Sequence, residues 1–317
     1  MENHPAPPPL VIALVGPTAS GKTALGIAIA AALDLAVLSV DSRQLYRGMD
    51  IGTATPTAAQ RARVRHELLD LRDPDQPLNV QDFAALARVA IQREQARRGM
   101  ALLVGGSGLY LQALTGGLQP PPVPAQPWLR HQLDQLGQSQ CHALLAEADP
   151  ASACRIGPGD AVRTQRALEI LYATGQPPSA LRQRTPPPWR LLELGLDPPD
   201  LASRIRRRTR AMYATGLLPE TAALLERFGP GCPLLDTIGY GEARRLLAGE
   251  LELEQAIALT DQRTRQYAKR QRTWFRRQHR PQWLQGLGRT IDRGGTPAGN
   301  GADLLSEALV AISQVLG

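Results

Sequence analysis

A short glycine-containing segment near the start of the sequence carries residue types suited to phosphate chemistry. It comprises Gly16, Pro17, Thr18, Ala19, Ser20, Gly21, Lys22 and Thr23, and it fits the pattern G-x-x-x-x-G-K-[ST] in full. The glycines let backbone N–H groups turn toward phosphate oxygens, and the amino end of a following helix adds a favourable field. Lys22 supplies a point charge for terminal phosphates, and the Thr23 hydroxyl suits Mg²⁺. We therefore expect this segment to bind a di- or triphosphate.

A carboxylate follows the next apolar run of the sequence. Asp41 begins the segment Asp41-Ser42-Arg43-Gln44, directly after residues 36–40. An aspartate at the carboxyl end of a parallel strand points into the ligand crevice, where it can accept a proton from a nucleophile. The same residue could instead cap the turn that follows it. The sequence leaves both interpretations open.

A third candidate group lies where a second carboxylate would be expected. A P-loop nucleoside triphosphatase needs a carboxylate at a neighbouring strand end to hold Mg²⁺, but the apolar run 101–104 ends in Gly105-Gly106-Ser107-Gly108. The Ser107 hydroxyl could donate a hydrogen bond to a departing phosphate oxygen. Alternatively, these small residues serve only a tight turn.

These groups need a common scaffold to bring them together. The apolar runs 10–15, 36–40 and 101–104 are typical of buried strands, whereas 24–33 and 80–98 favour helices. Strands that alternate with helices indicate a parallel sheet with right-handed crossovers. We therefore predict an α/β fold in which a P-loop type parallel sheet is flanked by helices.

A proline-rich stretch marks a change in organisation after this sheet. Residues 119–124 read QPPPVP, which is typical of a stiff linker. Helices are predicted over 128–147 and 160–174, and a strand over 189–196 would return the chain to the sheet. We therefore expect a helical insertion in the core domain.

The predicted domain bounds follow from this pattern. The core domain comprises residues 1–118 plus 189–317, and the insertion comprises 119–188. Within the second part of the core, the pattern is helical from 201 to about 282. A turn-rich stretch over 286–301 then precedes a short helix over 302–316.

Two arginine-rich stretches are candidates for contact with a polyanion. Five arginines between 204 and 210 crowd one predicted helix and cannot share a face, but Arg204 and Arg208 are spaced i, i+4 and could enter the site. The stretch 263–280 interleaves eight basic residues with Tyr267, Trp274 and Phe275. Such a run suits RNA phosphates and unpaired bases, or it is simply a solvated helix face.

Composition sets limits on the class of protein. With 317 residues, 43% hydrophobic and 21% charged, the chain has room for about two globular domains and is not globally disordered. Its net charge of +7 comes almost wholly from arginine, because Lys22 and Lys269 are the only lysines. A basic protein with clustered arginines suggests a polyanionic partner.

Several other classes are disfavoured. Cys141, Cys154 and Cys232 are odd in number and far apart, so we expect neither a disulfide framework nor a zinc module. The segment His66-Glu-Leu-Leu-Asp70 lacks the second histidine of H-E-x-x-H, which excludes a zinc protease. No apolar run approaches the ~20 residues of a membrane span, and residues 1–9 lack a signal-peptide pattern. We expect a cytoplasmic protein without membrane association.

Taken together, the segments resemble the bacterial tRNA dimethylallyltransferase family, also called tRNA isopentenyltransferases. The matching segments are GPTASGKT (16–23), DSRQLYRGMDIGTATP (41–56), HELLD (66–70), NVQDF (79–83), GGSGLY (105–110), RTQRALEI (163–170), TGQPPS (174–179), IGYGE (238–242) and YAKRQRTWFR (267–276). The P-loop alone is common to many families. Its combination with DSRQLY and YAKRQRTWFR is specific, and the matches cover most of the chain.

The resemblance implies a reaction and roles for particular residues. A dimethylallyl group would pass from dimethylallyl diphosphate to N6 of the adenosine at tRNA position 37, next to the anticodon. Asp41 would hydrogen-bond the N6 amine and take its proton, while Ser107 and Arg208 would stabilise charge on the departing diphosphate. Lys22, with Mg²⁺ on Thr23, would complete the clamp. Family members often carry threonine where Ser107 stands, so the hydroxyl is retained.

The resemblance also implies contacts with the tRNA anticodon stem-loop. The positions expected to meet tRNA are Asp41, Ser42, Arg43, Gln44, Ser107, Arg130, Val162, Arg163, Thr164, Gln165 and Arg166, and the basic run adds Lys269, Arg270 and Arg272. The insertion would then serve as a tRNA-gripping lobe. Nothing in the sequence argues for an oligomer, so we expect a monomer.

Three other functions are compatible with parts of the sequence. One is a prenyltransferase that modifies free adenine nucleotides, although such a substrate needs neither the insertion nor the basic aromatic run. Another is a P-loop small-molecule kinase that uses ATP, with Asp41 as the base. The last is an RNA-binding module with a nucleotide switch, which leaves Asp41 and Ser107 without a role.

Overall fold

The computed structural model describes residues 7–285 and 301–317. These residues form two compact units. One unit comprises the described residues up to Thr115 together with those from Pro188 onward, and the other comprises Gly116–Pro187. The predicted turn-rich stretch 286–301 lies almost wholly outside the described residues.

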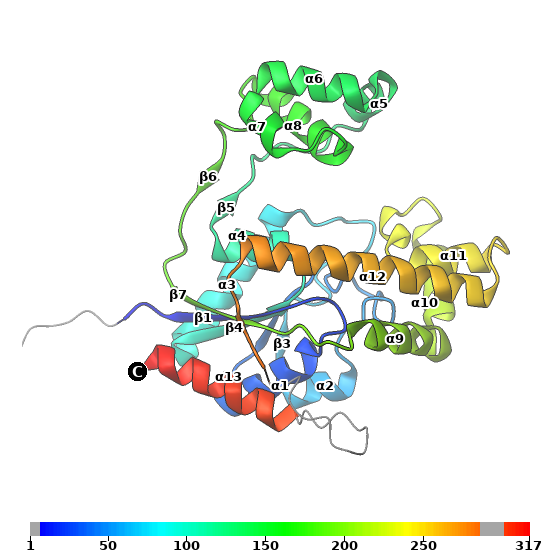
Figure 1. The fold of residues 1–317 in the computed structure, drawn as a ribbon. Coiled ribbons are helices and arrows are strands. Elements are labelled where there is room, and N and C mark those ends of the chain that lie inside the picture. Colours follow the sequence, from blue (N-terminus) through cyan, green and yellow to red (C-terminus); the bar gives the residue numbers. More distant parts are fainter. Residues whose placement is uncertain (1–6, 286–300) are drawn as a thin grey trace, which may run out of the picture. The chain divides into compact units, whose positions relative to one another are not determined.

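A six-stranded sheet forms the centre of the first unit (Figure 1). In spatial order the strands are β3 (His66–Glu67), β2 (Val37–Val40), β4 (Met100–Gly105), β1 (Leu10–Val15), β7 (Arg190–Gly195) and β8 (Gln282–Trp283). Every neighbouring pair is parallel. The α/β fold class with a parallel P-loop sheet is thereby confirmed.

Helices cover the sheet on both sides. They are α1 (Lys22–Leu33), α2 (Ala58–Arg63), α3 (Val80–Arg98), α4 (Gly108–Thr115), α9 (Leu201–Thr215), α10 (Leu217–Phe228), α11 (Tyr240–Leu247), α12 (Leu253–Gln278) and α13 (Gly301–Leu316), with a 3-10 turn η1 (Pro233–Asp236). Figure 1 shows the long helix α12 on one side of the sheet and α1 with α13 on the other.

The alternation of side chains along β1 explains this arrangement. Val11, Ala13 and Val15 pack with α3, α4 and α9 to α12, whereas Leu10, Ile12 and Leu14 pack with α1 and α13. All six are fully buried, because successive side chains on a strand point to opposite faces. Each large aliphatic side chain buried in this way contributes about 1.5–3 kcal/mol. A strand that is apolar on both faces therefore belongs at the centre of a covered sheet.

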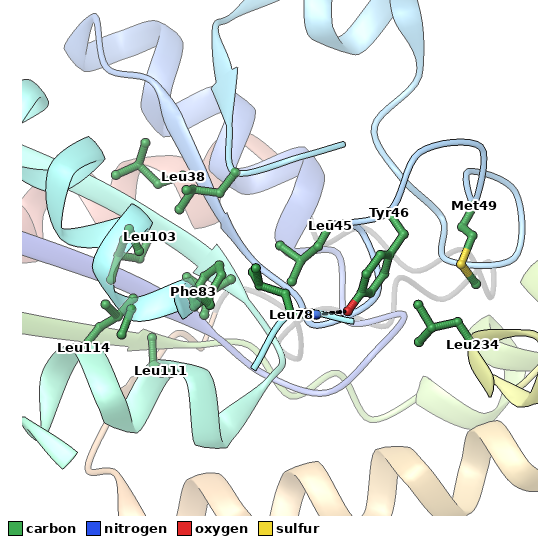
Figure 2. Packing of buried hydrophobic residues seen from close by; sticks show 14 of the residues in the cluster. Leu38, Leu45, Tyr46, Met49, Leu78, Phe83, Leu103, Leu111, Leu114 and Leu234 are labelled. Carbon is green, nitrogen blue, oxygen red and sulfur yellow. Dashed lines mark hydrogen bonds between the residues drawn. The ribbon is translucent and has the colours of Figure 1, made fainter. Parts of the chain in front are cut away.

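The segment after β2 is anchored in this core (Figure 2). Leu45 and Tyr46 are buried, and the Tyr46 hydroxyl accepts a hydrogen bond from the Leu78 N–H at 2.9 Å. The Tyr110 hydroxyl donates to the Leu78 carbonyl at 3.1 Å, and its ring lies 4.7 Å from that of Phe83. These contacts fix the polypeptide immediately beyond Asp41.

The second unit is a small helical body. It contains β5 (Leu118–Gln119), α5 (Pro127–Leu136), α6 (Gln138–Ala148), α7 (Pro150–Arg155), α8 (Ala161–Thr174) and β6 (Gln183–Arg184). The two short strands pair antiparallel. Its own apolar cluster includes Leu129, Leu133, Leu145 and Leu168.

Three element predictions need correction. The helix predicted over 128–147 is two helices, because Gly137 at φ 86° ends α5 and precedes α6. The helical stretch predicted from 201 to about 282 is α9 to α12, which ends at Gln278, and β8 follows. The two-residue strands β3, β5, β6 and β8 were not predicted, because two residues carry no periodic pattern.

Candidate active site

Two cavities meet at the carboxyl ends of the central strands. The larger has a volume of about 1400 Å³ and is lined by the P-loop residues Thr18 to Thr23, by Asp41 and by Arg204, Arg207 and Arg208 of α9. The smaller, of about 370 Å³, is lined by residues of α12 and of the segment 236–238. Six residues line both cavities: Thr18, Asp41, Thr53, Arg208, Met212 and Tyr267.

The loop between β1 and α1 is held in one conformation by a glycine and a buried lysine. Gly16 has φ 147°, and a Cβ atom there would lie 2.2 Å from the Leu196 carbonyl oxygen, so only glycine fits. The Lys22 ammonium group donates to the carbonyl oxygens of Gly16 at 2.8 Å and Pro17 at 2.7 Å. Burial lowers the pKa of Lys22 to about 7, the charge of Asp41 opposes this, and that of Arg208 adds to it.

Arg208 and Asp41 stand at the junction of the cavities. Arg208 Nη2 donates to Thr18 Oγ1 at 2.6 Å, and burial lowers the pKa of Arg208 while the Asp41 charge raises it. Asp41 Oδ1 accepts a hydrogen bond from the Arg43 N–H at 2.8 Å. Asp41 therefore caps its turn and also lines both cavities.

Ser107 lies beside this junction but lines neither cavity. It is 8% exposed, and its Oγ accepts a hydrogen bond from the Ser42 N–H at 2.9 Å. Tyr267 lies near the Ser107 hydroxyl, and burial raises the pKa of Tyr267 to about 12. Gln271, one turn along α12, donates to the Gly106 carbonyl oxygen at 2.8 Å.

A second loop forms part of the cavity walls. Gln44 Nε2 donates to the carbonyl oxygens of Thr53 and Ala54, and its Oε1 accepts from Ser39. On the other side, the Glu220 carboxylate accepts from the N–H groups of Ile51 and Gly52. The Gln44 side chain is thus engaged in holding this loop in place.

Known proteins resemble this chain over most of its length. The family model described as IPP transferase matches residues 44–278. A protein of Parasynechococcus marenigrum (strain WH8102) named tRNA dimethylallyltransferase is 64% identical over 278 residues, which cover 88% of this chain and 93% of that protein. One of Synechococcus sp. (strain CC9902) with the same name is 58% identical over 309 residues, covering 98% and 99%. The chain belongs to the tRNA dimethylallyltransferase family.

Solved structures agree with this family assignment. A full-length tRNA isopentenylpyrophosphate transferase from Bacillus halodurans matches with a TM-score of 0.65 at 35% identity, covering 95% of this chain and 98% of that one. A eukaryotic dimethylallyltransferase described as acting on tRNA matches with a TM-score of 0.78 at 26% identity, covering 97% and 79%. As a tRNA dimethylallyltransferase family member, the chain is a prenyltransferase.

The tRNA positions that the family resemblance assigns to the second unit differ in exposure. Val162 is 76% exposed and Arg163 is also exposed. Thr164 is fully buried, and its hydroxyl accepts from Gln138 at 3.1 Å, so this side chain offers no surface to a tRNA. Gln165 is half-buried and hydrogen-bonds Asp134.

Arg130 and Arg166 in this unit share one acidic partner. Arg130 donates from Nε and Nη2 to the two carboxylate oxygens of Glu169 at 2.7 and 2.9 Å, and Arg166 Nη1 lies 3.2 Å from the same carboxylate. Hydrogen bonding to Glu169 raises the pKa of Arg130. The pair of Arg130 with the buried Glu169 therefore joins α5 to α8, whereas Arg166 and Glu169 both lie on α8.

The basic residues predicted on α12 fall into two kinds. Lys269 and Arg270 are exposed, and Arg270 also lines the smaller cavity. Arg272 is half-buried and its Nε lies 2.6 Å from Asp197 Oδ1.

Among the described residues, no helix is long and apolar enough to cross a membrane.

Two residues of the site were not singled out from the sequence as site residues. Gln271 and Tyr267 line the larger cavity and contact the Gly105–Gly108 turn. The available signal was their position in the segment YAKRQRTWFR, where the i, i+4 spacing places them on one helix face. The sequence gives no indication that this face meets the P-loop.

Proposed function

We propose that this protein transfers a dimethylallyl group from dimethylallyl diphosphate to N6 of the adenosine at position 37 of tRNA. The observation that carries the proposal is the pair of cavities that meet at Asp41 and Arg208. The P-loop residues Thr18 to Thr23 line the larger cavity, and Thr18 alone of them also lines the smaller one, so the larger cavity suits the diphosphate donor. The smaller one, on the other side of Asp41, suits the acceptor base.

The proposed reaction requires a proton acceptor at this junction. The N6 nitrogen forms a bond to the first carbon of the dimethylallyl group as the bond from that carbon to the diphosphate oxygen breaks. The amine then loses a proton, which Asp41 accepts from its place between the two cavities. General-base assistance of this kind contributes on the order of 10²–10⁴ in rate.

Positive groups near the P-loop support departure of the diphosphate. Lys22 contacts Gly16 and Pro17 of the P-loop, and Arg208 contacts Thr18. Burial removes water from both cations, which lowers the pKa of each. Preorganised cations in such a site stabilise negative charge that grows in the transition state. The Ser107 hydroxyl would act on Asp41 through the Ser42 N–H, or donate to the diphosphate.

The donor set at the P-loop fits Mg²⁺ as part of the substrate complex. Thr23 lines the larger cavity at the start of α1. Mg²⁺ commonly keeps several waters and binds phosphate oxygens together with few protein ligands, so the Thr23 hydroxyl is sufficient as the protein's contribution. The ion would neutralise charge on the diphosphate.

Exposed residues of both units suit contact with the rest of the tRNA. On α12, Arg270 lines the smaller cavity and the neighbouring Lys269 is exposed. On α8, Val162 and Arg163 are exposed. The exposed positions of α8 would contact the tRNA, whereas the buried Thr164 would support the helix that carries them. We expect the protein to act as a monomer.

A transfer assay with several acceptors tests the proposal. Purified protein is incubated with Mg²⁺ and labelled dimethylallyl diphosphate, and label is counted in unmodified tRNA, in the same tRNA with guanosine at position 37, and in AMP. We expect label in the first tRNA alone. Label in AMP would instead identify an adenine-nucleotide prenyltransferase, and turnover of ATP without prenyl transfer would identify a kinase.

A further inference from the structure

Helix α12 directs a buried amide at the proposed machinery. Gln271 is 6% exposed and lies one helical turn beyond Tyr267, which lines both cavities. Its spacing of i, i+4 places both side chains on the same face of the helix. This face meets two loops that lie far from α12 in the sequence.

The Gln271 amide bridges these loops with both of its polar atoms. Its Oε1 accepts from the Thr18 N–H at 2.8 Å, and its Nε2 donates to the Gly106 carbonyl oxygen at 2.8 Å. Thr18 belongs to the P-loop after β1, and Gly106 belongs to the turn after β4. A neutral amide presents a donor and an acceptor side by side, which matches this pair of backbone groups.

The residues around the Gln271 amide are closely packed and hydrogen-bonded. A Cβ atom at Gly106 would lie 2.5 Å from Gln271 Nε2, so glycine makes room for the amide. On the P-loop side, the Thr18 hydroxyl accepts from Arg208 at 2.6 Å. On the other side, Ser107 holds the Ser42 N–H next to Asp41. Gln271 therefore connects the loop that holds Arg208 with the turn that holds the segment of Asp41.

We propose that Gln271 is a positioning residue for prenyl transfer, which sets the spacing between the P-loop and the Gly105–Gly108 turn. Through these two loops it places Arg208 and Asp41 relative to the reacting atoms. The inference rests on the proposed function, because it assigns Gln271 a role in that reaction. A displacement of about 1 Å in such a site can cost up to about 10² in rate.

The first test removes both hydrogen bonds while keeping the length of the side chain. Gln271→Met leaves the Thr18 N–H and the Gly106 carbonyl without this partner. We expect kcat to fall about 10–100-fold, with KM for each substrate changed by less than about threefold, because the binding surfaces stay in place. Active sites are counted by binding of Mg²⁺ and diphosphate, so that kcat refers to folded protein.

The matched control removes a buried hydrogen bond elsewhere on α12. The Tyr213 hydroxyl of α9 lies 2.9 Å from Thr260 Oγ1 of α12, and Tyr213 lines neither cavity. Tyr213→Phe should lower the melting temperature and leave kcat per active site unchanged. A purely structural role for Gln271 would give the same result as this control.

The second test uses a side chain that can switch its hydrogen-bonding pattern. In Gln271→Glu, a protonated carboxylic acid offers one donor and one acceptor, as the amide does, whereas the carboxylate only accepts. The kcat of this variant relative to wild type at the same pH should therefore rise as the pH falls from 8 to 5.5. The corresponding ratio for Gln271→Met should stay flat.

The outcomes separate this inference from the proposed function. Wild-type kcat in Gln271→Met, a loss explained by fewer active sites, or a flat pH ratio in Gln271→Glu would each overturn the positioning role. If wild-type protein fails to prenylate tRNA in the same assay, the proposed function is wrong instead.

Discussion

At the scale of single residues, the candidate site balances one carboxylate against two cations. Burial lowers the pKa of Lys22 and of Arg208, and in both cases Asp41 raises it again. Cations that have lost hydration gain more from a neighbouring anion than cations in water do. An anion bound beside Lys22 and Arg208 would therefore be held strongly, as the proposed function requires.

Replacement of Asp41 by asparagine tests the proton-accepting role. Asp41→Asn keeps an oxygen that can accept the hydrogen bond from Arg43, but it removes the basic carboxylate. We expect kcat to fall on the order of 10²–10⁴, while tRNA binding changes by less than about threefold. Single-turnover rates and a tRNA titration measure the two quantities separately.

The control for this variant is an aspartate remote from both cavities. Asp75 is exposed and lines neither one, so Asp75→Asn should leave rate and affinity unchanged. Equal losses of rate and of tRNA affinity in Asp41→Asn would count against a role as base.

Sequence reasoning succeeded where chemistry is local. The P-loop and Asp41 each follow a strand directly, so strand order and residue type were enough to place them at one edge of a sheet. Gln271 could not be found in this way, because 253 residues separate it from Thr18. Its role depends on tertiary packing of α12, which no local pattern encodes.

At the scale of elements, Asp149 holds two parts of the second unit together. Its Oδ1 accepts from the Ser152 N–H at 2.9 Å at the start of α7, and its Oδ2 accepts from the Ser179 N–H at 2.8 Å. Burial by itself would raise the pKa of Asp149, but hydrogen bonds from Ser152 and Ser179 lower it to about 2. The carboxylate thus ties the start of α7 to the segment beyond α8.

This pKa has a defined consequence for stability. Because the value in the folded unit lies below the usual 3.8, the stabilisation is present above about pH 4 and is lost as the pH falls through about 2. Asp149→Asn should lower the free energy of opening of this unit by about 1–2 kcal/mol at pH 7. The difference from wild type should shrink toward pH 2.

Hydrogen exchange of backbone amides in α6 to α8 measures this effect unit by unit. The exposed Asp134 lies in the same unit, and Asp134→Asn serves as the control with little expected change. A difference between Asp149→Asn and wild type that persists undiminished at pH 2 would contradict the assigned cause.

The errors at this scale have physical reasons. The predicted helix over 128–147 has helix-forming residues on both sides of Gly137, whose positive φ ends one helix and allows another to begin. Strands β3 and β8 contribute two residues each and are defined by their neighbours in the sheet. Composition and periodicity identify long elements, whereas short ones are products of tertiary pairing.

At the scale of the whole molecule, the net charge is +7, but the basic residues differ in whether a carboxylate neutralises them. Many arginines are paired with carboxylates, such as Arg272 with Asp197 and Arg98 with Asp34. Lys269 and Arg270 on α12 are exposed, and Arg270 borders the smaller cavity. Net charge predicted a polyanionic partner, but only the structure separates paired cations from accessible ones.

Salt dependence of tRNA binding tests which cations face the nucleic acid. In the double variant Lys269→Ala/Arg270→Ala, the slope of log K against log salt should become shallower by about 0.7–0.9 for each phosphate that the protein no longer neutralises. Arg98→Ala is the control, because Arg98 ends α3 and pairs with Asp34, at the opposite edge of the sheet from the P-loop. An unchanged slope in the double variant would remove α12 from the proposed tRNA surface.

The pairing of β5 with β6 bears on how such a chain can change over evolutionary time. Leu118 pairs with Arg184, and the Thr185 N–H donates to the Gly117 carbonyl at 3.1 Å, so the polypeptide enters and leaves the second unit at one point. A module whose ends adjoin can be enlarged, trimmed or exchanged by one recombination event without rerouting the remaining chain. The chain can thus gain, lose or replace this unit while the strand order of the six-stranded sheet stays the same.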